Sequence, residues 1–134
     1  MTEPVLDAVV FQMTDLMGQK EYGPALVKLR QLLKMQQEPI LILGAIGGHF
    51  RRLATARTLL DAGRSAGDLA RMYAIGEYAA RKNMAAAGKF SPGFFKKASE
   101  LVLETDRAMK TSFDDPERLL EVLVLQLAQE ARNG

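Results

Sequence analysis

The stretch from Pro39 to Leu53, PILILGAIGGHFRRL, is where the residue types of this sequence could bind a phosphate group. If this stretch formed a strand, a glycine-rich loop and the start of a helix, the backbone N–H groups at the helix N-terminus would point at a bound anion. The spacing does not fit, because Gly44, Gly47 and Gly48 match neither of the common glycine-rich phosphate-binding patterns, and no lysine follows directly. Nucleotide binding through this stretch is therefore not predicted.

Residues 65–87 are a second candidate, because their pattern is compatible with a helix-turn-helix. A capped short helix and a turn precede a basic helix that carries Arg81 and Lys82. In DNA-binding proteins the second helix of this motif lies in the major groove, and Asn83 is the residue there best suited to contact a base edge. A purely structural helical hairpin has the same pattern, so both interpretations stay open.

The sequence contains no recognisable catalytic or metal-binding constellation. It has no cysteine and a single histidine, His49, close to two arginines, which argues against thiolate and multi-histidine metal sites. We predict no catalysis, no cofactor, no metal and no small-molecule substrate, and we expect His49 to be a surface or half-buried packing residue. Asp106 and Lys110 are four residues apart, which predicts an exposed ion pair on a helix.

The elements that must position these residues are helical almost throughout. Apolar residues recur with a period of about 3.6, Pro39 and Pro92 suit the first turn of a helix, and Ser65 with Asp68 matches a capping box. The expected helices cover about 5–17, 22–35, 39–62, 66–72 and 77–87, and two more begin at 91–92 and at 115. The prediction is an all-α single domain over residues 1–134, with five to seven helices packed around the third and the last.

Three features of this pattern carry packing expectations. Gly44, Gly47 and Gly48 each cost a helix about 1 kcal/mol relative to alanine, so we expect a neighbouring helix to approach closely there. The last helix has apolar residues on nearly all sides, which predicts a central position or a covering partner. Methionines and aromatic residues are expected to fill the core.

The net charge of +2 hides a gradient along the chain. Residues 51–110 hold twelve basic and six acidic side chains, whereas residues 111–134 hold two basic and five acidic ones. Solvated helix faces are the ordinary explanation of such a gradient, and a surface that meets nucleic acid or an acidic partner is the alternative. The candidate interaction residues are Arg51, Arg52, Arg57, Arg81 and Lys82.

Two further observations bear on location. The longest apolar run, from Pro39 to Gly48, is too short to span a bilayer, and the N-terminus lacks the pattern of a signal peptide. We expect a soluble, cytoplasmic domain.

The ordered segments resemble the C-terminal helical domain of the bacterial DNA polymerase III delta subunit, a clamp-loader component. The stretches that carry this resemblance are VVFQMTDLMGQKEYGPALVKLRQLL, EPILILGAIGGHFRRLATARTLLDAG, SAGDLARMYAI, ARKNMAAAGKFS and ETDRAMKTSFDDPERLLEVLVLQLA. Together they cover about residues 7–130. The chain departs from the family at Tyr73-Ala74, where leucine-glycine is usual, and at Gly47 and Gly48 in mid-helix.

The resemblance implies a collar domain, the helical region through which clamp-loader subunits form a ring. It also implies that two AAA+-type domains, which are not in this chain, precede the collar. The implied partners are other clamp-loader subunits, with weak DNA contact at most and no membrane.

Two alternatives stay open from the sequence. One is a small DNA-binding regulator that uses residues 65–87, and the other is a scaffold or dimerisation domain unrelated to replication. Specific DNA binding that weakens steeply with salt would indicate a regulator.

Overall fold

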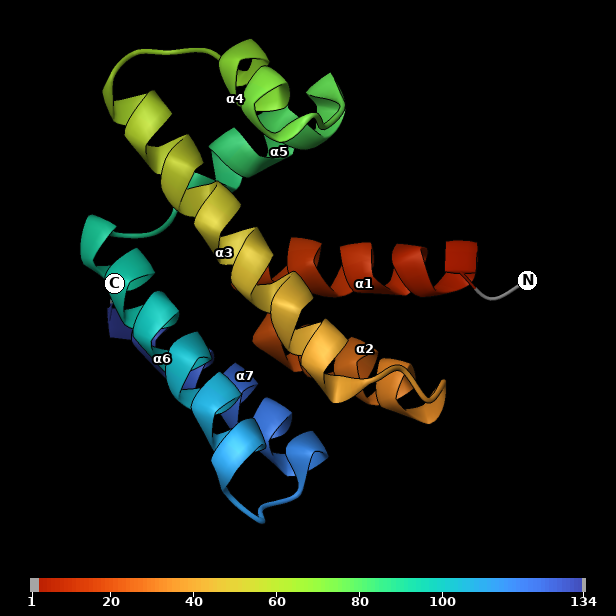
Figure 1. The fold of residues 1–134 in the computed structure, drawn as a ribbon. Coiled ribbons are helices and arrows are strands. Elements are labelled where there is room, and N and C mark those ends of the chain that lie inside the picture. Colours follow the sequence, from red (N-terminus) through yellow and green to blue (C-terminus); the bar gives the residue numbers. More distant parts are fainter. Residues whose placement is uncertain (1–2, 134) are drawn as a thin grey trace.

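The computed structural model describes residues 3–133, with side chains from residue 7 onward, and within that part of the chain it contains seven α-helices and no strand (Figure 1). The helices are α1 (Glu3–Gly18), α2 (Tyr22–Lys34), α3 (Pro39–Asp61), α4 (Ala66–Tyr73), α5 (Glu77–Ala87), α6 (Pro92–Thr111) and α7 (Pro116–Asn133). The predicted all-α class is confirmed, and most predicted boundaries agree to within one or two residues.

Local signals in the sequence explain where these helices begin. Pro39 and Pro92 occupy the first turns of α3 and α6, where a missing N–H leaves no hydrogen bond unmade. Ser65 and Asp68 form the expected capping box at the start of α4, and the Ser65 N–H donates to Asp68 Oδ2 over 3.2 Å. The predicted starts therefore follow from local chemistry.

Helix α3 runs through the middle of the molecule, as Figure 1 shows. It packs against α1, α4, α5, α6 and α7, while α7 packs against α2, α3 and α6. Most core side chains lie between α3 and the two helical hairpins α1–α2 and α6–α7. A second, smaller core of Ala56, Leu69, Ala80 and Ala87 joins the α4–α5 hairpin to the C-terminal half of α3.

Helix α7 is amphipathic rather than apolar on nearly all sides. Its buried face contains Leu120, Leu123 and Leu127, whereas Val122 and Leu125 are 38% and 58% exposed. A single stripe contacts the core, so the fold itself does not surround α7, and a partner that covers the exposed apolar side chains stays a prediction.

The expectation that methionines and aromatic residues fill the core also holds only in part. Met13 and Met17 are fully buried, but Met72, Tyr78 and Phe113 are well exposed. Phe113 lies in the connection between α6 and α7, so helical periodicity does not direct its side chain to the core.

Candidate interaction site

The five basic residues chosen from the sequence do not share one surface. Arg51 lies in a groove between α3 and α6, whereas Arg52 and Lys82 line a small cavity beside α1 and α5. Arg57 contacts the connection between α5 and α6, and Arg81 lies on the exposed side of α5. Neighbouring residues of a helix point about 100° apart, which separates Arg51 from Arg52.

Arg57 is a structural residue in this fold. Its Nη1 donates to the backbone oxygen of Phe90 over 2.8 Å, and its Nε lies 3.1 Å from Asp61 Oδ1. The first contact holds the short connection between α5 and α6 against α3. Arg81 makes only an exposed pair with Glu77 on its own helix, at 3.3 Å.

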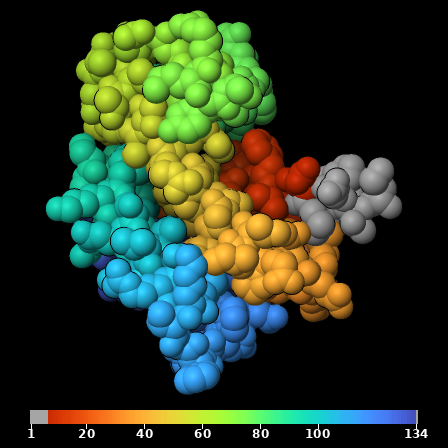
Figure 2. All heavy atoms as spheres, viewed as in Figure 1, coloured from red at the N-terminus to blue at the C-terminus, as the bar shows by residue number. Residues whose placement is uncertain are grey.

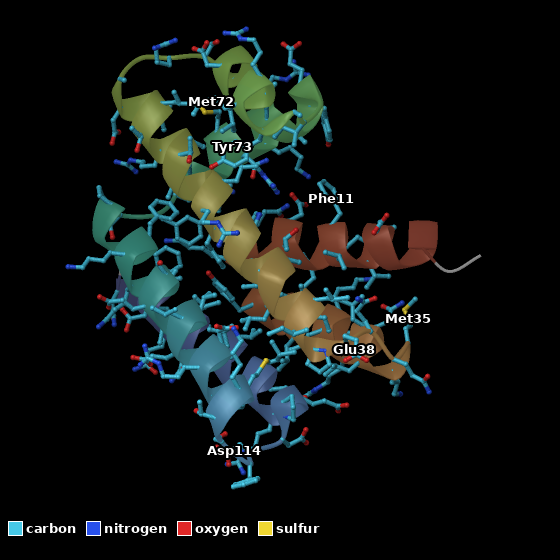
Figure 3. The ribbon with its side chains drawn as sticks, viewed as in Figure 1. Phe11, Met35, Glu38, Met72, Tyr73 and Asp114 are labelled. Atoms are coloured by element: carbon cyan, nitrogen blue, oxygen red, sulfur yellow. The ribbon has the colours of Figure 1, made fainter. Side chains whose placement is uncertain are left out.

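Lys82 links α5 to α1. Its Nζ lies 2.9 Å from Asp15 Oδ2 and within 6 Å of the ring centroids of Phe11 and Tyr78. Phe11 projects from α1 towards the α4–α5 hairpin (Figure 3). The hydrogen bond to Asp15 raises the pKa of Lys82, outweighing partial desolvation. The charge of Lys82 is therefore largely engaged within the fold.

His49 is buried, which corrects the expectation of a surface or half-buried residue. Only 6% of it is exposed, and neither ring nitrogen has a hydrogen-bond partner in the protein. Desolvation, reinforced by the nearby charge of Arg52, lowers the pKa of His49 to about 3. A cavity of about 20 Å³ adjoins it, with Arg52, Lys82 and Asn83 in its lining. That volume is enough for one water molecule.

The groove between α3 and α6 is the feature that sequence reasoning missed. It has a volume of about 520 Å³ and is lined by Ile40, Leu43, Gly44, Gly47, Phe50, Arg51 and Ala54 of α3 and by Phe95, Ser99, Val102, Leu103 and Asp106 of α6. Along each helix the lining residues are spaced mostly three or four positions apart, so they form one stripe on the surface of that helix. The stripes were visible in the sequence, but their juxtaposition was not.

The three glycines of α3 have different roles. A Cβ on Gly47 would lie 3.1 Å from Val102 Cγ1, so the expected close approach of a neighbouring helix is confirmed there. A Cβ on Gly44 would meet nothing within 4 Å, and one on Gly48 would meet only Arg51 of the same helix. For Gly44 and Gly48 the expectation was wrong: no neighbouring helix approaches them.

Polar groups lie at few points of the groove. Among the described residues Arg51 forms no ion pair, whereas Asp106 pairs with Lys110 at 3.1 Å, as predicted from their spacing. The groove is therefore mainly apolar, and one free guanidinium lines it.

The structure gives no support to DNA reading by residues 65–87. Asn83 is buried, and its side-chain amide donates to the backbone oxygen of Ala79 over 2.6 Å. Lys82 is paired with Asp15 of α1. Of the three residues expected to contact DNA, two are therefore held against the rest of the domain, and the third, Arg81, is exposed and pairs with Glu77 of its own helix.

Two absences complete the description. Among residues 3–133, no group of histidine and acidic side chains is arranged to hold a metal ion. None of the helices in that range has the length and apolar character needed to cross a membrane.

Within the described part of the chain, seven helices packed around a central third helix define an all-α helical domain. Residues 7–127 match the family described as DNA polymerase III delta subunit, C-terminal domain. The chain belongs to that family, as the resemblance of its ordered segments predicted.

A solved structure agrees with this assignment. The fold is similar to that of the Bacillus subtilis DNA clamp loader delta protein, with a TM-score of 0.81 and 25% sequence identity. The match covers 92% of this chain and 37% of that protein, so this chain spans well under half of its length. No curated protein matches the chain.

Proposed function

We propose that this domain is a non-catalytic assembly domain of a DNA polymerase III clamp loader, which contributes to loading the sliding clamp on DNA. The observation that carries the proposal is the family match over residues 7–127, together with the same fold in a clamp loader delta protein. Its partners are other clamp-loader subunits, contacted through helical surfaces in the cytoplasm.

The surface of the domain supports an assembly role. Ile40 and Leu103 line the groove between α3 and α6 and are 43% and 58% exposed. Contiguous exposed apolar surface is typical of protein–protein contacts. The free guanidinium of Arg51 adds a charge that a partner can complement.

The test is co-expression of the chain with the other clamp-loader subunits of the organism that encodes it. We expect the chain to co-purify in a defined complex, identified by native mass spectrometry. Replacing Arg51 by glutamate should weaken the complex, whereas Arg81→Glu, on the exposed side of α5, should change it less. If the remaining subunits assemble while the chain elutes alone, the proposal is wrong.

DNA binding separates this function from that of a regulator. We expect at most weak, sequence-independent binding of the purified chain, with an affinity that falls as salt rises. Fluorescence anisotropy with several unrelated duplexes measures it. Tight binding to one sequence would replace the assembly function with a regulatory one.

A further inference from the structure

We propose that the groove between α3 and α6 binds an amphipathic helix of another clamp-loader subunit, with a carboxylate of that helix opposite Arg51. This inference rests on the proposed assembly function. It places the subunit contact at one surface of the domain and requires the partner helix to carry an apolar face and a carboxylate.

The shape of the groove favours a helix. Its lining runs from Ile40 to Ala54 along α3 and from Phe95 to Asp106 along α6, and 1.5 Å per residue gives the α3 side a length of about 20 Å. Figure 2 shows α3 and α6 side by side at the surface of the molecule. Amphipathic helices bind in grooves of this kind through side chains spaced three or four residues apart.

The exposure of the walls also favours a helix over a small ligand. Small-molecule sites bury most of the ligand's surface, whereas Ile40 and Leu103 at the walls of this groove are 43% and 58% exposed. Here Arg51, Ser99 and Asp106 are the polar lining residues, and Asp106 already pairs with Lys110. What remains is an apolar trough with one free cation, which an apolar helix face carrying one carboxylate complements.

Gly44 keeps the groove open. It is exposed on α3, and a Cβ there would meet no atom within 4 Å. A side chain at this position would therefore extend into the groove without disturbing the fold. In a helix interior, replacing glycine also removes a conformational penalty.

The first experiment is Gly44→Leu in the co-expressed complex. We expect a melting temperature at or above that of the wild type and an affinity for the partner subunits lower by at least about tenfold, the effect of losing one well-packed anchor. The matched control is Gly23→Leu on α2, where a Cβ also meets nothing within 4 Å and which does not line the groove between α3 and α6. That variant should assemble like the wild type.

The second experiment identifies what occupies the groove. The chain has no cysteine, so Ser99→Cys provides a unique attachment point for a photo-crosslinker, and Gln31→Cys on the exposed side of α2 is the control. We expect the Ser99 probe to crosslink to a helix of another clamp-loader subunit, at a segment with a nearby Asp or Glu, and the Gln31 probe to crosslink at a different site or not at all.

The outcomes separate the two proposals. If the wild-type chain does not enter the complex, the assembly function itself fails. If the wild-type chain assembles and Gly44→Leu assembles equally well, the groove is not the contact. A Ser99 crosslink to a second copy of this chain, or to no protein in an intact complex, also overturns the inference.

Discussion

Val102 of α6 packs against the backbone of α3 at Gly47, where an added Cβ would lie 3.1 Å from Val102 Cγ1. Carbon atoms in favourable contact are about 3.5–4.0 Å apart. The glycine therefore lets α3 and α6 approach more closely than alanine would. At Gly44, one turn earlier on α3, an added Cβ would meet no atom within 4 Å.

These two glycines should respond differently to the same change. Gly44→Ala should raise the free energy of unfolding by about 0.5–1 kcal/mol, because alanine is the better helix former. Gly47→Ala gains the same propensity but displaces the stiff side chain of Val102. Urea unfolding should therefore find Gly47→Ala less stable than Gly44→Ala by about 1 kcal/mol or more. In a Val102→Ala background the difference should shrink, and equal effects in the wild-type background would argue against this contact.

Ala74 should become more favourable as glycine. It ends α4 in the left-handed conformation, with φ of 53° and ψ of 44°, which L-residues adopt at a cost of about 1 kcal/mol. Ala74→Gly should raise the free energy of unfolding by about 0.5–1 kcal/mol. Ala85→Gly, at an exposed position inside α5, should lower it by a similar amount. Chemical denaturation of both variants measures whether the free energy of unfolding rises in Ala74→Gly and falls in Ala85→Gly.

His49 should make the domain sensitive to mild acid. Its pKa is about 3 in the folded protein because of burial, against about 6.5 in an unfolded chain, so the unfolded state binds the proton more readily. Above pH 6.5, His49 is neutral in both states and does not lower the free energy of unfolding. As pH falls below 6.5, the unfolded chain takes up the proton and the free energy of unfolding decreases. By pH 5 the loss reaches up to about 2 kcal/mol.

The comparison that isolates His49 uses urea unfolding at pH 7.5 and pH 5.0. His49→Leu removes the only histidine of the sequence and should flatten the stability profile in this range. The charged groups that face His49 include Arg52, which lowers its pKa, and the paired Lys82 and Asp15, which line the same small cavity. An unchanged slope in His49→Leu would show that another group causes the acid sensitivity.

Asp15 should control the pKa of Lys82. The hydrogen bond from Lys82 Nζ to Asp15 Oδ2 is the main cause of the raised pKa. Asp15→Asn should therefore lower the pKa of Lys82, measured from the Cε chemical shift in an NMR titration. Glu77→Gln is the matched control. Glu77 lies on α5, as Lys82 does, but its carboxylate pairs with Arg81. The pKa of Lys82 should not change in that variant.

Arg57 and Arg81 should differ in their effect on stability. Arg57→Ala leaves the partly buried backbone oxygen of Phe90 without its donor, which should cost about 1–3 kcal/mol. Arg81→Ala breaks a solvent-exposed pair with Glu77, and such pairs contribute at most about 1 kcal/mol. Thermal unfolding of both variants measures the contrast, and equal losses would show that the Phe90 contact is unimportant.

The sequence alone determined the fold class, the helix boundaries and the family. Pro39, Pro92 and the Ser65–Asp68 box mark helix starts through interactions within one turn, and such local signals can be read from neighbouring residues. The family could be predicted because the order of the segments is a property of the chain. The ion pair of Asp106 with Lys110 is likewise local.

Only the tertiary structure decided which helix faces meet. His49 and Asn83 are buried because α1, α3 and α5 converge on them. Each lies three or four residues from buried neighbours on its own helix, but which helices cover that stripe cannot be read from the spacing. Arg51 and Arg52 are adjacent in sequence yet line different sites, and the groove that contains Arg51 exists because α6, about fifty residues later, lies beside α3. Helical periodicity defines stripes along each helix, but the pairing of stripes depends on the close approach of distant helices, which here uses the missing side chain of Gly47.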